Sequence, residues 1–211
     1  ARAPVHTEAV RVLDGTIRIA IPAMVTKMIP PFLETLREIK AKAKRAVEFH
    51  FFPNMTGLSH TAVTKELRRW FSDCKVYARD QYEPYLANLG RCNAMFSTFP
   101  FGGTNSVIDS FVMGLPVLTL EGDQIHSRSD ASMIRRVGLP DWLIAHSKNE
   151  YVDAALLYID SGELLRDMLR DQLRKCDVDK VFFGSPPPGM EKCFLEAFER
   201  IYEGALNDQA G

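Results

Sequence analysis

A group of glycines and small polar residues stands directly before a helix-like stretch of this sequence. The segment FPFGGTNSVIDSFVM, which starts at residue 99, contains in order Gly102, Gly103, Thr104, Asn105 and Ser106. Glycine lets a ligand approach the backbone, and the free N–H groups of a first helical turn attract anions. The three polar side chains add hydroxyl and amide donors. The segment therefore favours binding of a phosphate or a diphosphate.

One carboxylate follows these residues within the same predicted helix. Asp109 comes about one turn after Asn105 and Ser106, so it is expected on their face of the helix. A carboxylate at this place can accept hydrogen bonds from ribose hydroxyls. The alternative interpretation needs no ligand: the glycines form a turn, a polar residue caps the helix, and Asp109 interacts with the helix dipole.

Four more residues follow strand-like runs and are expected near the same edge of a sheet. Lys27 could neutralise a departing diphosphate, although a lysine at a strand end is usually solvated. His126 follows the run LPVLTL. A role in ligand binding is favoured over a catalytic role, and most histidines in such loops are simply exposed to solvent. Tyr82 and Tyr85 could stack on a base, and such aromatic residues pack into the core at least as often.

The elements that must position these residues alternate along the chain. Runs rich in β-branched and aromatic residues predict strands at 16–23, 46–53, 74–78, 94–99 and 115–120. Helical spacing predicts helices at 30–45, from 59 onward, at 105–113, at 148–159, at 161–176 and at 189–206. In the first helix the buried face is predicted to carry Phe32, Leu33, Leu36 and Ile39. Ser59 or Thr61 is predicted to cap the second.

This alternation predicts an α/β fold, a Rossmann-like three-layer domain with a parallel sheet and a helical C-terminal tail. Residues 1–15 are interpreted as a lead-in segment and residues 16–211 as the domain with its C-terminal helices. Open sheets of this kind bind ligands at the carboxyl ends of their strands. The loop 100–106 is expected at that edge.

Composition excludes several classes of function. The 211 residues are 46% hydrophobic and carry 26 basic against 27 acidic side chains, so no electrostatic signature of a nucleic-acid binder is present. The four cysteines are dispersed without a CxxC pair, which argues against a zinc site and a disulfide framework. No apolar run approaches the roughly 20 residues of a membrane span, and the first residues lack a secretory signal. A cytoplasmic protein is expected.

Three longer segments resemble glycosyltransferase family 41, which includes O-GlcNAc transferase and bacterial enzymes that glucosylate asparagines of adhesins. They read DGTIRIAIPAMVTKMIPPFLE, FPFGGTNSVIDSFVMGLPVLTLEGDQIHSR and RRVGLPDWLIAHSKNEYVDAA, and the resemblance covers residues 13–204. Two motifs are more similar to the bacterial enzymes than to O-GlcNAc transferase, namely FPFG-x-TN-x-x-ID and GLPxWLIA. The resemblance implies the C-terminal half of a GT-B fold, with the N-terminal half missing.

The resemblance also assigns roles to residues. It implies that Lys27 contacts the donor diphosphate and supports departure of the leaving group. Residues 104–106 match the helix start at the diphosphate, and Asp109 matches the carboxylate that binds the ribose. Tyr85 falls near the position that lines the uracil, where O-GlcNAc transferase has a histidine. His126 matches a histidine of the adhesin glucosyltransferases, which suggests a role in sugar selection.

These expectations define an inverting transferase that binds UDP-glucose or UDP-GlcNAc, needs no metal, and glycosylates an asparagine of a protein in preference to serine or threonine. Two alternatives remain open: a donor-binding module without activity of its own, and an enzyme similar to UDP-sugar 2-epimerases. A nicotinamide dehydrogenase is the weakest rival, because no GxGxxG follows the first predicted strand.

Overall fold

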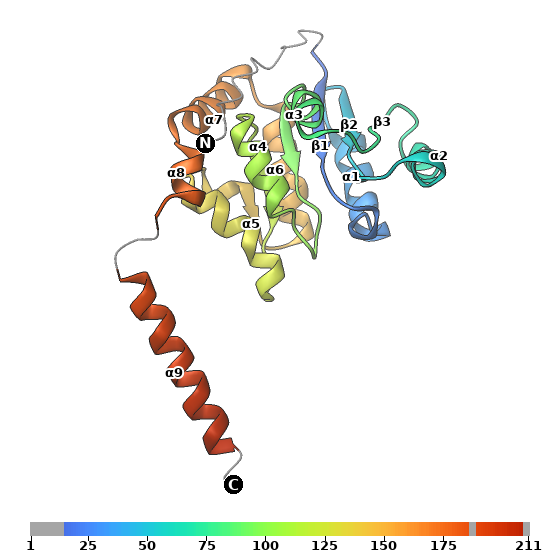
Figure 1. Ribbon diagram of the computed structural model, residues 1–211. Coiled ribbons are helices and arrows are strands. Elements are labelled where there is room, and N and C mark those ends of the chain that lie inside the picture. Colours follow the sequence, from blue (N-terminus) through green and yellow to red (C-terminus); the bar gives the residue numbers. More distant parts are fainter. Residues whose placement is uncertain (1–14, 186–188, 209–211) are drawn as a thin grey trace. The chain divides into compact units, whose positions relative to one another are not determined.

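The computed structural model describes residues 15–185 and 189–208 (Figure 1). The predicted lead-in segment therefore lies outside the described residues except for its last position. The three prolines at 186–188 also lie outside them. The chain divides into two compact units, one that ends at Val178 and one that starts at Asp179.

A parallel sheet forms the centre of the first unit. Within the described residues it has six strands in the order β3-β2-β1-β4-β5-β6, and every neighbouring pair is parallel. The strands are β1 (Ile17–Ile21), β2 (Val47–Phe51), β3 (Lys75–Val76), β4 (Ala94–Phe96), β5 (Val117–Leu120) and β6 (Ile144–Ala145). The predicted Rossmann-like α/β fold is confirmed.

The central strand β1 shows why these apolar runs become strands. All five of its residues, IRIAI, are buried, because β2 and β4 flank it and helices cover both faces of the sheet. Ile19 pairs with Phe49 of β2 on one side and with Ala94 of β4 on the other. Burial on both faces favours continuous apolar runs over alternating ones.

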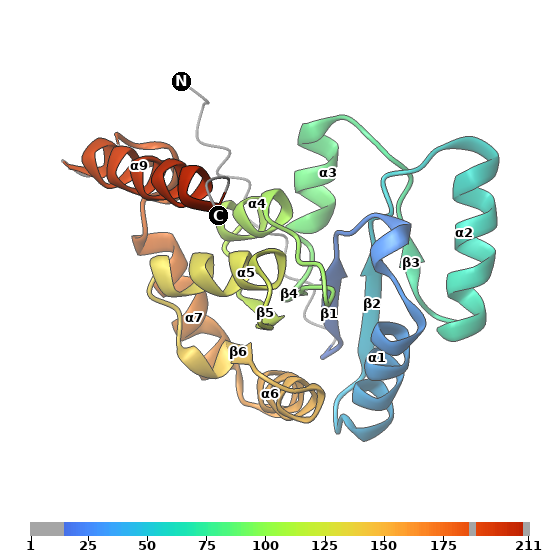
Figure 2. The same ribbon diagram turned by 90° about the horizontal axis from the view of Figure 1, so that it is seen from below.

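Helices cover both faces of the sheet. In order they are α1 (Pro30–Lys42), α2 (Gly57–Trp70), α3 (Tyr82–Leu89), α4 (Asn105–Val112), α5 (Ile125–Arg136), α6 (Lys148–Asp160) and α7 (Glu163–Lys175). Helix α8 (Val178–Phe183) spans the unit boundary, and α9 (Met190–Asp208) belongs to the second unit. Figure 2 shows α1 and α6 side by side on one face, with α3, α4 and α5 on the other.

The predicted α1 is confirmed in its start, its prolines and its buried face. The predicted cap of α2 is wrong: the helix begins at Gly57, so Thr56 is the N-cap residue, and Ser59 and Thr61 lie inside the helix. Two short 3₁₀ turns, Val25–Lys27 after β1 and Asp141–Leu143 before β6, complete the described elements. Among the described residues, no helix combines the length and the apolar character that a membrane crossing requires.

A buried arginine closes the end of α6, and its removal is expected to destabilise the first unit. Arg166 of α7 is 4% exposed, and its guanidinium donates to the carbonyl oxygens of Tyr158, Ile159 and Ser161. Carbonyls at a helix end have no partner within the helix, so a buried cation there satisfies them.

We expect Arg166→Met to lower the free energy of unfolding by about 2 kcal/mol, because it leaves buried carbonyls without a donor. Urea unfolding measures the change. Arg174→Met on the same helix is the matched control, since Arg174 makes only an exposed pair with Asp171 and should change stability by less than about 0.5 kcal/mol. Equal effects of the two substitutions would contradict the capping role.

Candidate functional site

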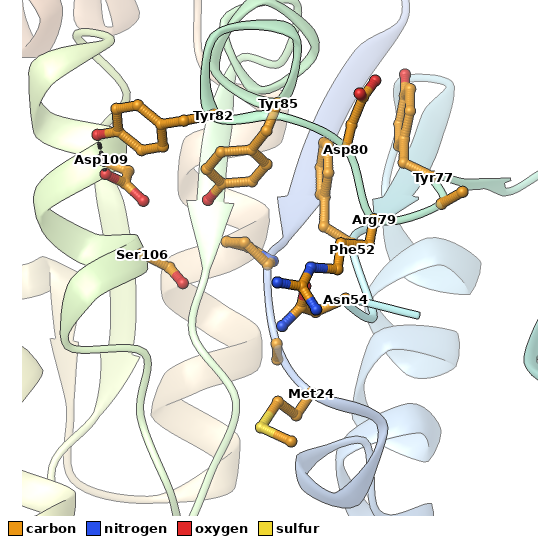
Figure 3. Close-up of a pocket in the computed structure, with 13 residues that line it drawn as sticks. Met24, Phe52, Asn54, Tyr77, Arg79, Asp80, Tyr82, Tyr85, Ser106 and Asp109 are labelled. Carbon is orange, nitrogen blue, oxygen red and sulfur yellow. Dashed lines mark hydrogen bonds between the residues drawn. The ribbon is translucent and has the colours of Figure 1, made fainter. Parts of the chain in front are cut away.

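The carboxyl ends of β1, β2 and β3 border a pocket of about 330 Å³ (Figure 3). Its walls come from the loops after these strands, from α3 and from α4. It is lined by Pro22, Ala23, Met24, Phe52, Asn54, Tyr77, Ala78, Arg79, Asp80, Tyr82, Tyr85, Ser106 and Asp109. The sheet order reverses between β1 and β4, and the crevice at such a reversal is where open α/β sheets bind ligands.

Two polar residues of α4 face the pocket together. Ser106 and Asp109 are three positions apart, so they share a face of the helix, as the sequence predicts. The Tyr82 hydroxyl donates a 2.6 Å hydrogen bond to Oδ1 of Asp109 (Figure 3). The carboxylate is thereby held in position at the pocket wall.

Aromatic rings form the opposite wall. Phe52 stacks on Tyr77 with ring centroids 4.5 Å apart, and the rings of Phe52 and Tyr85 are nearly perpendicular with centroids 5.6 Å apart. Burial, followed by the charge of Asp109, raises the pKa of the Tyr85 phenol well above its ordinary value. Tyr85 is therefore a neutral hydrogen-bonding group beside Asp109, and it packs against the core as well as lining the pocket.

Several pocket residues were not predicted from the sequence. Phe52 and Tyr77 lie within segments predicted as strands, and Asn54, Arg79 and Asp80 follow them. Figure 3 shows the Arg79 guanidinium pointing into the pocket. Position directly after β2 and β3 is the signal that could have identified these residues, because both strands end at the ligand edge.

Lys27 lies beside the glycine loop and not in the pocket lining. It ends the 3₁₀ turn after β1, is half-buried, and its ammonium donates a 2.5 Å hydrogen bond to the carbonyl oxygen of Gly102. The expectation that Lys27 reaches the ligand edge near the glycine loop is therefore met.

The glycine loop has an internal partner that the sequence did not reveal. The carboxylate of Asp130 accepts hydrogen bonds from the N–H groups of Gly103, at 2.7 Å, and Thr104, at 3.1 Å. These two N–H groups of the loop are therefore not available to a ligand. A Cβ atom on Gly102 would lie 2.2 Å from Asp130 Oδ2, so packing alone requires glycine there.

The first turn of α4 still offers donors. Thr104 is its N-cap residue, with a φ of +31° and no capping bond from its side chain. The N–H groups of Asn105 and Val107 donate to no protein group in the part of the chain that the structure describes. A helix start with such groups favours an anion.

His126 lies apart from the pocket, in the first turn of α5. It is exposed, and its ring stacks on Phe101 with centroids 4.1 Å apart. Phe101 is itself 50% exposed and precedes Gly102. The structure thus brings Tyr85, Ser106 and Asp109 together in the pocket, and it places Lys27 and His126 beside the loop that borders β4.

A buried histidine supports the aromatic wall. His50 of β2 is 1% exposed, and it contacts the Tyr77 hydroxyl at 3.0 Å and a Glu48 carboxylate oxygen at 2.9 Å. Burial lowers the pKa of His50 from 6.5 to about 4. Between these two pH values the imidazole binds a proton in the unfolded chain but not in the folded chain. The contribution of His50 to the free energy of unfolding is therefore fully present above pH 6.5 and is lost as the pH falls toward 4.

We expect the free energy of unfolding to drop by about 2 kcal/mol from this group as the pH falls through that range. Urea unfolding at pH 7 and about pH 4.5, for the native sequence and for His50→Gln, isolates the contribution. The variant should lose less stability on acidification than the native sequence. Parallel pH profiles would contradict the assignment.

The sheet order and the pocket at its reversal define a Rossmann-like α/β domain with a pocket at the ligand edge of its sheet. No protein-family model matches the sequence. A UDP-glucose:protein N-beta-glucosyltransferase of Actinobacillus pleuropneumoniae is 32% identical over 182 residues, which cover 85% of this chain and 29% of that protein. A rice protein named "Probable UDP-N-acetylglucosamine--peptide N-acetylglucosaminyltransferase SPINDLY" is 34% identical over 113 residues, 51% of this chain and 12% of that protein.

A solved structure shows the same fold. An O-GlcNAc transferase variant from Thermobaculum terrenum superposes with a TM-score of 0.73 at 22% identity, over 97% of this chain and 40% of that one. By contrast, the chain spans less than a third of the length of the Actinobacillus glucosyltransferase that it matches. Together the matches confirm the resemblance to glycosyltransferase family 41 and to the C-terminal half of a GT-B catalytic region.

Within residues 15–185 and 189–208, no three His, Cys, Asp or Glu side chains are grouped so that they could hold a metal ion.

Proposed function

We propose that this chain is the donor-binding part of a glycosyltransferase that uses a UDP-hexose, either UDP-glucose or UDP-GlcNAc, to glycosylate a protein side chain. The observation that carries the proposal is the pocket at the β1–β4 reversal, with Asp109 in its wall and Lys27 beside it. The named activities of the relatives support the same reaction class. Cytoplasmic localisation stays a prediction.

The strand order suggests how the donor extends along the sheet edge. The nucleoside occupies the pocket at the ends of β3, β2 and β1. There Asp109 accepts hydrogen bonds from the ribose hydroxyls, and the aromatic wall faces the base. The diphosphate lies at β1 and β4, between Lys27 and the start of α4. The hexose then reaches β4 and β5, where Phe101 and His126 stack. Neighbouring strands lie about 4.8 Å apart, so each further strand adds about this distance to the path of the donor along the sheet edge.

In the proposed reaction an asparagine, or less favourably a serine or threonine, attacks the anomeric carbon on the face opposite the phosphate. The bond between carbon and phosphate oxygen breaks and UDP leaves with both electrons, while the attacking N–H or O–H group of the acceptor releases its proton to solvent. Attack from the opposite face inverts the anomeric configuration. Lys27 and the α4 start stabilise the charge on the departing diphosphate, which is the task of a divalent ion in many other transferases.

Calorimetric titration of the chain with UDP, UDP-glucose, UDP-GlcNAc and NAD, with and without magnesium, tests the donor assignment. We expect binding of UDP and of one UDP-sugar that magnesium does not change. Absence of UDP binding to a folded chain, or preference for NAD, would contradict it.

A second candidate is a donor-binding module without transfer activity of its own. Binding of a UDP-sugar without transfer to an acceptor peptide supports the module. Release of a free epimerised sugar without any acceptor would instead indicate an epimerase.

A further inference from the structure

Asp130 is a buried carboxylate for which neither the sequence motifs nor the donor path has a use. It lies in α5, at 1% exposure, under the loop that joins β4 to α4. The N–H groups of Gly103 and Thr104 in this loop donate hydrogen bonds to its carboxylate. It also accepts from the hydroxyl of Ser97, at 2.5 Å, and from that of Ser129, at 3.2 Å.

These bonds connect both ends of the β4–α4 connection to a residue that lies about 30 positions further along the chain. Ser97 follows β4, Gly103 and Thr104 form the loop, and Asp130 comes from the helix after the next strand. The same loop carries the Gly102 carbonyl that holds Lys27. It also ends at Thr104, whose positive φ is unfavourable for a residue with a Cβ atom and must be held by its surroundings.

A carboxylate suits this place for a chemical reason. All four groups that reach Asp130 are N–H or O–H donors, and an ionised carboxylate only accepts. An asparagine of the same shape would turn an NH₂ group toward at least one donor. The loop geometry therefore depends on the carboxylate and not only on the volume of the side chain.

We propose that Asp130 is a positioning residue that fixes the loop 102–104, so that the Lys27 ammonium and the first turn of α4 face one diphosphate. The inference rests on the proposed function. Asp130 does not touch the donor: it holds the Gly102 carbonyl and the start of α4 in register. None of the four groups that donate hydrogen bonds to Asp130 belongs to the residues that line the nucleoside pocket.

The test compares UDP with uridine, because only UDP carries the diphosphate. In Asp130→Asn we expect affinity for UDP to fall about tenfold or more while affinity for uridine changes less than about twofold. A residue that merely supports the fold would weaken both ligands alike. Asp123→Asn, an exposed carboxylate before α5, is the matched control and should leave both affinities unchanged.

A second variant keeps the test decisive if Asp130→Asn does not fold. Ser97→Ala removes one donor to Asp130 without changing a charge, and we expect the ratio of UDP to uridine affinity to fall by about threefold. An unchanged ratio in the folded variant would overturn the inference. Failure of the native chain to bind UDP would instead refute the proposed function.

Discussion

Replacing Lys27 by methionine is expected to weaken binding of UDP by about 100-fold while binding of uridine stays unchanged. The ammonium lies at the β1–β4 reversal, and its bond to the Gly102 carbonyl aims it at the start of α4. A hydrogen bond between two charged groups is worth about 1.5–3 kcal/mol, which corresponds to this loss. Methionine retains most of the length and removes the charge. Calorimetric titration with the two ligands measures both affinities.

Lys148→Met is the control for this experiment. Lys148 starts α6, pairs with Glu38 at 3.6 Å and is not among the residues that line the pocket, so its replacement should affect neither ligand. A loss of uridine binding in Lys27→Met would show that the substitution disturbs the nucleoside pocket. Unchanged UDP affinity would remove Lys27 from the diphosphate site.

Replacing Asp109 by alanine is expected to weaken uridine and UDP alike, by about 100-fold. Both ligands carry the ribose, and the carboxylate would accept hydrogen bonds from its hydroxyls. The diphosphate should therefore not change the size of the loss in affinity. The substitution also leaves the Tyr82 hydroxyl without its partner at the pocket wall. Asp80→Ala provides the comparison, because Asp80 lines the same pocket from the β3 side and has no assigned ribose contact.

A ligand without ribose hydroxyls distinguishes the direct contact from a general change of the pocket. The affinity of 2′,3′-dideoxyuridine for the native chain should already be low, and Asp109→Ala should lower it by less than about twofold. Comparable losses for uridine and its dideoxy form would show that Asp109 supports the pocket without touching the ribose.

The strands and the ligand edge could be predicted because they depend on local pattern. The run IRIAI is apolar throughout, as a central parallel strand requires, and the five predicted strands all occur. Pro30 and Pro31 mark the start of α1 in the structure as in the sequence. The strand β6, Ile144–Ala145, was missed because the short apolar run at 142–145 is divided between the 3₁₀ turn Asp141–Leu143 and the strand.

The parts of the site that were missed depend on distant contacts. Asp130 takes its role from Ser97 and Gly103, which lie 33 and 27 residues away, and no local pattern records such a meeting. Gly102 looked like an opening for a ligand, whereas in the structure the Asp130 carboxylate fills the space where its side chain would be. Only the assembled fold distinguishes these two reasons for a glycine.

The close approach of Gly102 to Asp130 also predicts how the sequence can vary among relatives. A side chain at position 102 fits only if position 130 becomes smaller, because the two compete for one space. A smaller residue at 130 in turn leaves the N–H groups of Gly103 and Thr104 in need of another acceptor. Positions 102 and 130 should therefore change together during evolution, as a linked pair of substitutions on the two sides of α4 and β5.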